Sequence, residues 1–388
     1  MDLNQVLLTA VNSRASDVHF KAGQPPVLRI DGELVPLENY ESTDSSQMAK
    51  LAYQMMNERQ REHFLREREI DMGYGVSGLG RFRVNIFQQR GTIAISLRVV
   101  PFGISSFEDL HLPIKVLERL SMEVRGLIIV TGTTGSGKST TLAAMIDYIN
   151  RRRRCHIITI EDPIEFLHRD QTAIISQREV GNDTETFAQA LKMALRQDPD
   201  VILVGEMRDF DTIETALLAA ETGHLVFSTL HTLDAVETVN RIVAVYPPYQ
   251  QKQIRLQLAG VLKGVISQRL LPRADDEGRV PAVEVMVSTA RTRDCMVDKD
   301  KTRELHEAIT EGHATYSMQT FDQSLMWLLK QNLITYEEAL RHSSNPDDFA
   351  LRVKGILASS DTSWEEFEKT EEEEEAKQLE VERFQDDR

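Results

Sequence analysis

Residues 132–139 read Gly132-Thr133-Thr134-Gly135-Ser136-Gly137-Lys138-Ser139, and they fit the phosphate-binding pattern G-x-x-x-x-G-K-[ST]. Just before this loop, the chain has the apolar run Leu127-Ile128-Ile129-Val130, which is typical of a buried strand. Just after it, the segment from Thr140 to Asn150 carries apolar residues at helical spacing. The loop therefore lies between a strand and a helix, which is the context in which this pattern binds phosphate.

Each part of this loop has a chemical role in holding a nucleotide. Glycines let the backbone N–H groups turn toward the phosphates, and the start of the following helix adds a favourable dipole. Lys138 is expected to reach the β- and γ-phosphates, and Ser139 is expected to offer its hydroxyl to Mg²⁺. The predicted binding residues are Gly132, Thr133, Thr134, Gly135, Ser136, Gly137, Lys138, Ser139 and Thr140.

The bulk composition of the 388 residues indicates a globular protein of two or three domains. Hydrophobic residues make up 41% of the chain, and no run approaches the roughly 18 apolar residues of a membrane span. The N-terminal residues lack the order of a signal peptide, so we expect a cytoplasmic protein that does not insert into the membrane. The two cysteines, Cys155 and Cys295, are far apart in the sequence and form no zinc pattern.

The net charge of −16 is unevenly distributed along the chain. Thirteen acidic and four basic residues fall between Asp361 and Arg388, and we predict an acidic, disordered tail over residues 359–388. A partner-binding role for this tail is the alternative. The acidic body argues against nucleic acid as a partner. The run Arg151-Arg152-Arg153-Arg154 is the exception, and it fits either an anion contact or a solvated helix end.

Two patterns of secondary structure divide the chain. Residues 1–100 are predicted to form a small α/β domain with antiparallel strands, including an Asp31-Gly32 hairpin turn and helical patterning over residues 45–67. Residues 101–115 form the linker. Residues 116–358 alternate strands with helices, which predicts an α/β fold with a largely parallel sheet. The strands expected in that sheet cover residues 126–131, 156–161, 201–205, 224–229 and 281–286.

Arginines alternate with apolar residues in one strand of the first domain. Arg81 and Arg83 share a face, opposite Phe82 and Val84, and Arg98 lies near the end of the next strand. Arginines placed in this way can bind phosphate oxygens across a domain or subunit boundary. An ordinary solvated strand face explains the same pattern equally well.

Polar residues follow three further strands of the predicted parallel sheet, whose carboxyl ends are expected to meet at the nucleotide crevice. Glu161, Asp162 and Glu165 stand in one short turn, and a carboxylate there suits the deprotonation of water beside the γ-phosphate. Glu206 follows an apolar strand and is predicted to hold Mg²⁺. His231 is placed to sense the γ-phosphate, although a lone histidine is more often structural.

The order and spacing of these motifs resemble the secretion ATPase superfamily, and within it the PilT/PilU branch of type IV pilus retraction ATPases. The resemblance extends from Met1 to about Lys354. Further segments that match the family are Ser16-Asp17-Val18-His19, Gly80-Arg81-Phe82-Arg83-Val84-Asn85, Gln177-Arg178-Glu179-Val180-Gly181, Leu195-Arg196-Gln197-Asp198-Pro199-Asp200 and Met318-Gln319-Thr320-Phe321-Asp322-Gln323.

The resemblance implies a hexameric ring of chains that hydrolyse ATP with Mg²⁺. Each chain would have a PAS-like N-terminal domain and a RecA-like ATPase domain, and the ring would act on an inner-membrane platform protein at the inner face of the cell membrane. By the family's motifs, Glu165 is the general base, Glu206 is the acid of the second nucleotide motif, and Arg83 and Arg98 reach the nucleotide. Glu161 and Asp162 complete the acidic motif, and His224 and His231 form the histidine motif.

One helix departs from the PilT pattern and favours a PilU-like protein. Where retraction ATPases of the PilT type read AIRNLIRE, this chain has Glu304 to Glu311, and two arginines are replaced by His306 and Thr310. The next loop, residues 312–317, is also shorter. This departure suggests that the protein assists retraction together with a paralogous ATPase.

Three other functions fit parts of the sequence. One is an ATPase for pilus extension or type II secretion, although many of those carry a four-cysteine zinc motif that this chain lacks. The second is a RecA-type motor acting on DNA, which the acidic body disfavours. The third is a nucleotide-binding scaffold for a partner motor, which the full set of carboxylates disfavours.

Overall fold

The computed structural model describes residues 2–30, 32–76, 78–100 and 103–355. It contains two compact units, the first made of residues 1–106, 121–127 and 139–229, and the second of residues 107–120, 128–138 and 230–388. The predicted tail, the linker residues Pro101 and Phe102, and Asp31 lie outside the described residues.

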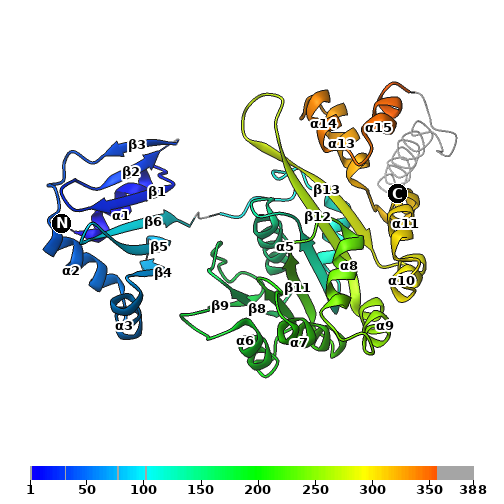
Figure 1. Ribbon diagram of the computed structural model, residues 1–388, viewed down its shortest axis with the longest axis horizontal. Helices are drawn as coiled ribbons and strands as arrows, with labels where there is room; N and C mark the ends of the chain where they lie inside the picture. Colours follow the sequence, from blue (N-terminus) through cyan, green and yellow to red (C-terminus); the bar gives the residue numbers. More distant parts are fainter. Residues whose placement is uncertain (1, 31, 77, 101–102, 356–388) are drawn as a thin grey trace, which may run out of the picture. The chain divides into compact units, whose positions relative to one another are not determined.

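The N-terminal residues form an antiparallel six-stranded sheet with three helices (Figure 1). The strand order is β3-β2-β1-β6-β5-β4. The strands are β1 (Asp17–Lys21), β2 (Val27–Ile30), β3 (Glu33–Pro36), β4 (Glu69–Val76), β5 (Gly80–Gln89) and β6 (Thr92–Val99). The helices are α1 (Leu3–Asn12), α2 (Ser45–Met55) and α3 (Glu58–Glu67).

Local sequence signals explain how this part folds. Phe82, Val84 and Ile86 of β5 are fully buried, as the alternating pattern predicts. The pairing of Ile30 with Glu33 confirms the hairpin between β2 and β3. The helical patterning expected over residues 45–67 corresponds to two helices, because Asn57 caps a second helix by accepting a hydrogen bond from the Gln60 amide at 2.9 Å.

The rest of the chain contains a seven-stranded sheet with the order β13-β12-β7-β11-β10-β8-β9. Pairings of β8 with β9 and of β10 with β8 and β11 are parallel, and β12 and β13 form an antiparallel hairpin. The strands are β7 (Gly126–Thr131), β8 (His156–Glu161), β9 (Ile174–Glu179), β10 (Val201–Val204), β11 (Leu225–Leu230), β12 (Leu262–Pro272) and β13 (Arg279–Val287).

Helices alternate with these strands and then end the described chain. The first group is α4 (Ile114–Ser121), α5 (Lys138–Arg152), α6 (Phe187–Ala194), α7 (Phe210–Glu221), α8 (Ala235–Ala244) and α9 (Gln251–Val261). The second group is α10 (Ala290–Val297), η1 (Thr302–Glu304), α11 (Leu305–Glu311), α12 (His313–Tyr316), α13 (Phe321–Lys330), α14 (Tyr336–His342) and α15 (Pro346–Val353). None of these helices, within the described residues, is long and apolar enough to cross a membrane.

Burial accounts for the composition of the strands. Every residue of β7, β10 and β11 is buried, as expected for strands that are covered on both faces, and this explains their continuous apolar runs. The sequence patterns did not predict β9 and β12. β9 is an edge strand with only one buried residue, so it carries no apolar run.

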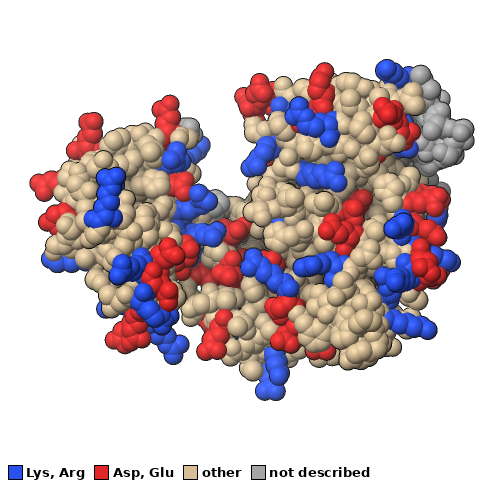
Figure 2. All heavy atoms as spheres, viewed as in Figure 1, with Lys and Arg blue, Asp and Glu red and all other residues tan. Residues whose placement is uncertain are grey.

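The surface carries mixed charges. Figure 2 shows Lys and Arg side chains interspersed with Asp and Glu side chains over the face in view. Together with the net charge of −16, this distribution gives nucleic acid no continuous basic surface on that face.

Replacing Phe82 with alanine tests the core of the N-terminal sheet. The Phe82→Ala change removes a fully buried ring and is expected to lower the free energy of unfolding by about 3–5 kcal/mol. Urea unfolding followed by circular dichroism measures the loss. The control is Leu34→Ala, whose side chain is 55% exposed and whose loss is expected to cost within about 0.5 kcal/mol. Equal effects of the two changes would contradict the assigned core.

Candidate functional site

The glycine-rich loop connects the end of β7 to the start of α5. Gly132, the first residue after β7, has φ of +141°, and a Cβ atom there would collide with the carbonyl oxygen of Gln268 and with the side chain of Ser136. Only glycine fits this position, so the backbone of β12 presses directly against the loop. The loop therefore has the strand-to-helix geometry that its sequence predicts.

Two side chains of the loop point to an anion as its ligand. The Lys138 ammonium donates hydrogen bonds to the carbonyl oxygens of Gly132 and Thr133, both at 2.9 Å, so it is held across the loop. Ser136 is only 3% exposed, and its Oγ has no hydrogen-bond partner among the described residues. A buried polar atom normally has a partner, so this hydroxyl fits a phosphate oxygen as its missing neighbour.

The first turn of α5 carries the remaining hydroxyls of the predicted site. Ser139 and Thr140 follow Lys138 directly and are half-buried. At the N-terminus of a helix, backbone N–H groups and hydroxyls favour a negative charge. The fit of this loop to a nucleotide phosphate rests on these residues, and Ser139 is the one suited to Mg²⁺.

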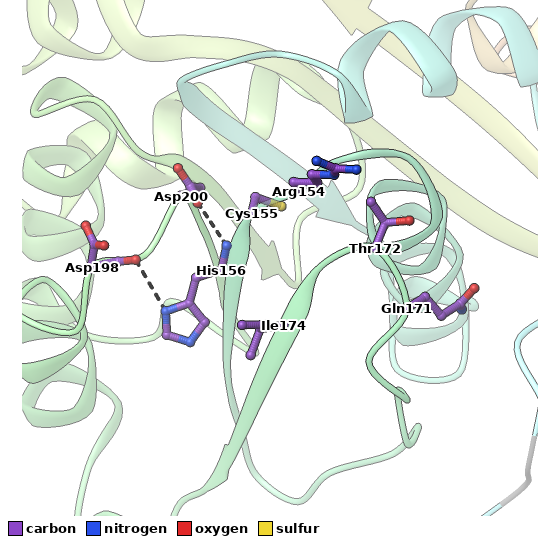
Figure 3. A pocket seen from close by; sticks show the side chains of 8 residues that line it. All are labelled: Arg154, Cys155, His156, Gln171, Thr172, Ile174, Asp198 and Asp200. Atoms are coloured by element: carbon purple, nitrogen blue, oxygen red, sulfur yellow. Dashed lines mark hydrogen bonds between the residues drawn. The ribbon is translucent and has the colours of Figure 1, made fainter.

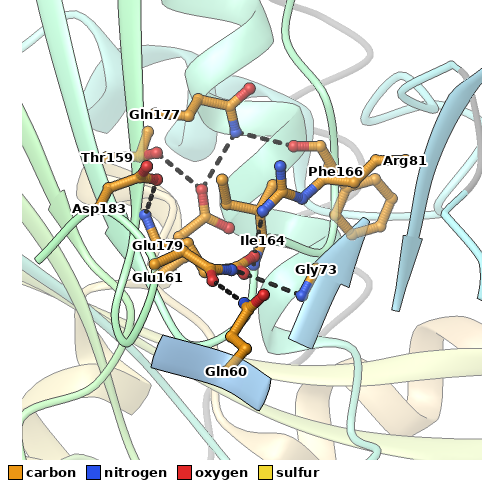
Figure 4. A network of polar contacts seen from close by, with 11 residues as sticks. Gln60, Gly73, Arg81, Thr159, Glu161, Ile164, Phe166, Gln177, Glu179 and Asp183 are labelled. Carbon is orange, nitrogen blue, oxygen red and sulfur yellow. Dashed lines mark hydrogen bonds and ion pairs between the residues drawn. The ribbon is translucent and has the colours of Figure 1, made fainter. Parts of the chain in front are cut away.

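The acidic turn at the end of β8 contains carboxylates in different environments, and Figure 4 shows that of Glu161. Glu161 accepts hydrogen bonds from Thr159 Oγ1 at 2.7 Å and from Gln177 Nε2 at 3.1 Å. Burial raises the pKa of the Glu161 carboxyl above its ordinary value, and these hydrogen bonds oppose the rise. Asp162 and Glu165 are exposed. Glu161 therefore helps to hold the turn in place through its hydrogen bonds, whereas Glu165 is accessible to water.

Glu206 stands just after β10, at the same edge of the sheet. The Gly205 amide donates to the Ile160 carbonyl at 2.8 Å, which ties the end of β10 to the end of β8. The Glu206 side chain is 15% exposed and forms an ion pair with Arg208. The hydrogen bond that Arg208 donates to Glu206 within this ion pair raises the pKa of the Arg208 guanidinium. Arg208 carries no sequence signal beyond its position two residues after the acid.

The two histidines of the predicted site flank β11 at opposite ends. His224 precedes the strand, and its Nδ1 lies 2.9 Å from the Ala219 carbonyl oxygen at the end of α7. His231 follows the strand and is exposed. Six strand residues separate them, a length of about 20 Å. The structure thus does not bring His224 to the end of β11 where His231 lies.

The two arginines predicted to reach the nucleotide are direct neighbours across the β5–β6 pair. Arg83 and Arg98 are Cα partners in the register. Arg98 Nε donates to Asp17 Oδ1 at 2.9 Å, and Arg83 is exposed. Like charges directly opposite each other on a sheet are unfavourable, and the Asp17 carboxylate offsets this repulsion at Arg98.

A separate cavity of about 650 Å³ lies at the amino end of β8, away from the acidic turn (Figure 3). His156 in this cavity donates its backbone N–H to Asp200 at 2.8 Å, and its ring lies 3.0 Å from the Gln197 carbonyl oxygen. Burial raises the pKa of the Cys155 thiol, which keeps it protonated. Arg154, from the run of four arginines, also lines it. The cavity is therefore distinct from the acidic turn at the other end of β8.

Glu284 of β13 is a buried carboxyl that contacts the first residue of helix α8. It is 3% exposed and accepts the N–H of Ala235, the first residue of α8, at 3.0 Å. Burial raises the pKa of Glu284 from 4.5 to about 7, with Asp234 and Asp322 adding to the rise and Arg269 opposing it. No local sequence pattern marks Glu284 as functional, because it lies inside an apolar strand.

An α/β fold with a phosphate-binding loop between a buried strand and a helix defines a nucleotide-binding protein of the P-loop class. Comparison with known proteins gives its family. A family model described as Type II/IV secretion system protein matches residues 1–366, and the chain belongs to this family.

Relatives and a solved structure agree with that assignment. The type IV pilus retraction ATPase PilT of Pseudomonas aeruginosa is 44% identical over 90% of this chain and 100% of its own length. The type IV pilus ATPase PilU of the same organism is 39% identical over 91% of this chain and 92% of its own length. A crystal structure of the pilus retraction motor PilT with bound ADP matches with a TM-score of 0.81 and 47% identity, covering 89% of this chain and 98% of that one.

The raised pKa of Glu284 predicts a pH dependence of stability. Between pH 4.5 and 7 the folded protein keeps a proton that the unfolded chain has lost, so the free energy of unfolding falls as pH rises, by up to about 3 kcal/mol. Glu284→Gln removes this contribution. The variant should therefore gain stability relative to the parent between pH 5 and pH 8, measured by urea unfolding. A difference between the two proteins that is the same at every pH would refute the prediction.

Proposed function

We propose that this protein is an ATP-hydrolysing motor that powers or assists the retraction of type IV pili. The observation that carries this proposal is the 44% identity to a retraction ATPase over that protein's whole length. The glycine loop, whose buried Ser136 hydroxyl has no hydrogen-bond partner within the described part of the chain, offers the phosphate site that such an enzyme needs. Pili of type IV and twitching motility are thus the expected biological setting.

Each residue of the predicted site has a separate role in ATP hydrolysis. In this proposal Lys138 and the loop amides bind the phosphates, and Ser139 and Glu206 are the residues that would hold Mg²⁺, which would supply positive charge beside the phosphoryl oxygens. Glu165 accepts a proton from the attacking water, because the family's motif places the base there and its carboxylate is exposed, as is that of Asp162. His231 donates a hydrogen bond to the terminal phosphate. The sheet order β7-β11-β10-β8 supports the convergence of these residues.

The N-terminal sheet supplies the response to the nucleotide. We propose that Arg83 and Arg98 bind the γ-phosphate, because the two cations face each other across a strand pair. Their release after hydrolysis would let the PAS-like N-terminal domain rotate about the linker of residues 101–115. Six chains form a ring in this proposal, and the ring moves an inner-membrane platform protein from the cytoplasmic side of the cell membrane.

The helix α11 favours an assisting role. It carries His306 and Thr310 in place of two arginines of the PilT pattern, and Thr310 Oγ1 donates to the His306 carbonyl at 2.9 Å. Glu307 and Glu311 on the same helix pair with Arg291 of α10. One arginine pairs with two carboxylates, so α11 keeps a net negative charge where the PilT pattern has two arginines, and this difference fits a protein that retracts pili together with a paralogous ATPase.

Replacing the loop lysine tests the catalytic assignment. Lys138→Ala removes the cation that binds the phosphates and is expected to lower kcat for ATP hydrolysis by about 100-fold or more. Release of inorganic phosphate by the purified protein measures it. Lys192→Ala, at an exposed position of helix α6 outside the predicted nucleotide site, serves as the control and should hydrolyse ATP at the parent rate. Hydrolysis by the Lys138 variant at the control rate would defeat the assignment of the site.

Deletion of the gene tests the biological role. Cells without the protein should keep surface pili but lose part or all of their twitching, since retraction fails while extension continues. Pilus counts by microscopy and twitching-zone diameters measure these two outcomes. A copy carrying Lys138→Ala distinguishes a motor from a scaffold, because a scaffold would restore twitching without hydrolysing ATP. Loss of all pili in the deletion strain would instead indicate an extension ATPase.

A further inference from the structure

Glu179, the last residue of β9, is a buried carboxylate beside the acidic turn. It is 1% exposed, and it is the Cα partner of Glu161 at the end of β8. Its Oε2 accepts the backbone N–H of Ile164 at 3.0 Å. Ile164 directly precedes Glu165, so a hydrogen bond to Glu179 holds the backbone from which the proposed base extends.

The same carboxylate binds the N-terminal sheet (Figure 4). Arg81 of β5 forms an ion pair with Glu179 Oε2 at 2.6 Å, and the Gly73 amide of β4 donates to Oε1 at 3.2 Å. The Glu179 side chain in this pair is 2% exposed and that of Arg81 is 20% exposed. A buried carboxylate held by an arginine and two backbone N–H groups is fully engaged, so movement of any partner affects the others.

A second contact reinforces this connection. Asn182, in the turn after β9, donates its side-chain amide to Glu179 and accepts a hydrogen bond from Gln60 of α3 at 2.7 Å. Helix α3 and strands β4 and β5 thus all reach the end of β9. Arg81 and Arg83 lie on the same face of β5 but have different surroundings, since Arg81 is paired with Glu179 while Arg83 is exposed.

We propose that Glu179 is a positioning residue, which orients the turn that carries Glu165 according to the position of strands β4 and β5 of the N-terminal sheet. This proposal rests on the proposed function, because it assigns to Glu165 the role of base. Rotation of the sheet would withdraw Arg81 from Glu179, leave its buried charge with fewer partners and loosen the Ile164 backbone. Hydrolysis is then fast only when the sheet is docked, which couples the chemistry to the movement.

Gly73 offers a way to break the contact without removing a charge. A Cβ atom at Gly73 would lie 2.6 Å from Glu179 Oε1 and would also collide with the Arg81 guanidinium. Gly75, two residues further along β4, has no atom within 4 Å of its Cβ position. Neither glycine has a positive φ, so alanine is compatible with the backbone at both sites. Gly73→Ala and Gly75→Ala are therefore a matched test and control.

Steady-state hydrolysis of Mg-ATP by the full chain tests the proposal. We expect Gly73→Ala to lower kcat about 10-fold or more through misplacement of the base, with KM within about twofold of the Gly75→Ala control. Glu179→Gln should lower kcat similarly, and the double change Gly73→Ala with Glu179→Gln should cost little beyond either alone. Equal kcat for Gly73→Ala and Gly75→Ala would overturn the proposal. So would additive losses in the double variant.

Hydrogen exchange separates this proposal from the function on which it rests. In the Gly73→Ala protein, the amide of Ile164 should exchange faster than in the Gly75→Ala protein, whether or not ATP is hydrolysed. Faster exchange at Ile164 in a protein that never hydrolyses ATP would refute the proposed function but would support the contact between Glu179 and the Ile164 backbone. Unchanged exchange with normal hydrolysis would defeat only the role of Glu179. If Gly73→Ala lowers the melting temperature relative to the Gly75→Ala control, Arg81→Gln, which adds no atom to the contact, is used as the test variant. The same results for kcat and exchange then support or overturn the proposal.

Discussion

The close approach of the Gly132 backbone to the carbonyl oxygen of Gln268 is the contact on which the phosphate site depends. It fixes the direction in which the chain leaves β7, and therefore where the loop amides and the Lys138 side chain point. Thr131, just before the loop, donates its hydroxyl to Ser267 of β12 at 3.0 Å, so the same strand supports the loop twice. A side chain at position 132 would push the loop away from β12 and undo this arrangement.

Carboxylates of the same chemical type have different roles here because their environments differ. Glu161, Glu179 and Glu284 are enclosed and satisfied by specific donors, so they hold backbone and side chains in place. Glu165 is exposed and remains available to water. Burial raises the pKa of Glu161 and Glu284, whereas hydrogen bonds from N–H and O–H donors favour the charged form. Exposure to solvent, rather than residue type, distinguishes the carboxylates that hold the structure in place from the one that is accessible to water.

Several features of the fold followed from local patterns. The strand–loop–helix unit around Lys138 and the apolar strands before Glu161 and Glu206 have the locations that their sequences predict. Alternation in β5 correctly indicated that Phe82 and Val84 are buried. The break between α2 and α3 was missed, since a helical pattern continues across it while a single cap at Asn57 starts a new helix. β9 was missed because an edge strand carries no continuous apolar run.

The order of residues along the chain was enough to identify the phosphate loop, the parallel sheet and the acidic turn, because each depends on neighbours within a few residues of one another. It was not enough to reveal that Glu179 binds Arg81, 98 residues away in the sequence, or that Glu284 accepts the Ala235 amide, 49 residues away. Those relations arise from strand pairing and burial, which bring distant segments into contact and give identical side chains different partners. Local periodicity carries no information about such partners, so they became visible only once the strands were in register.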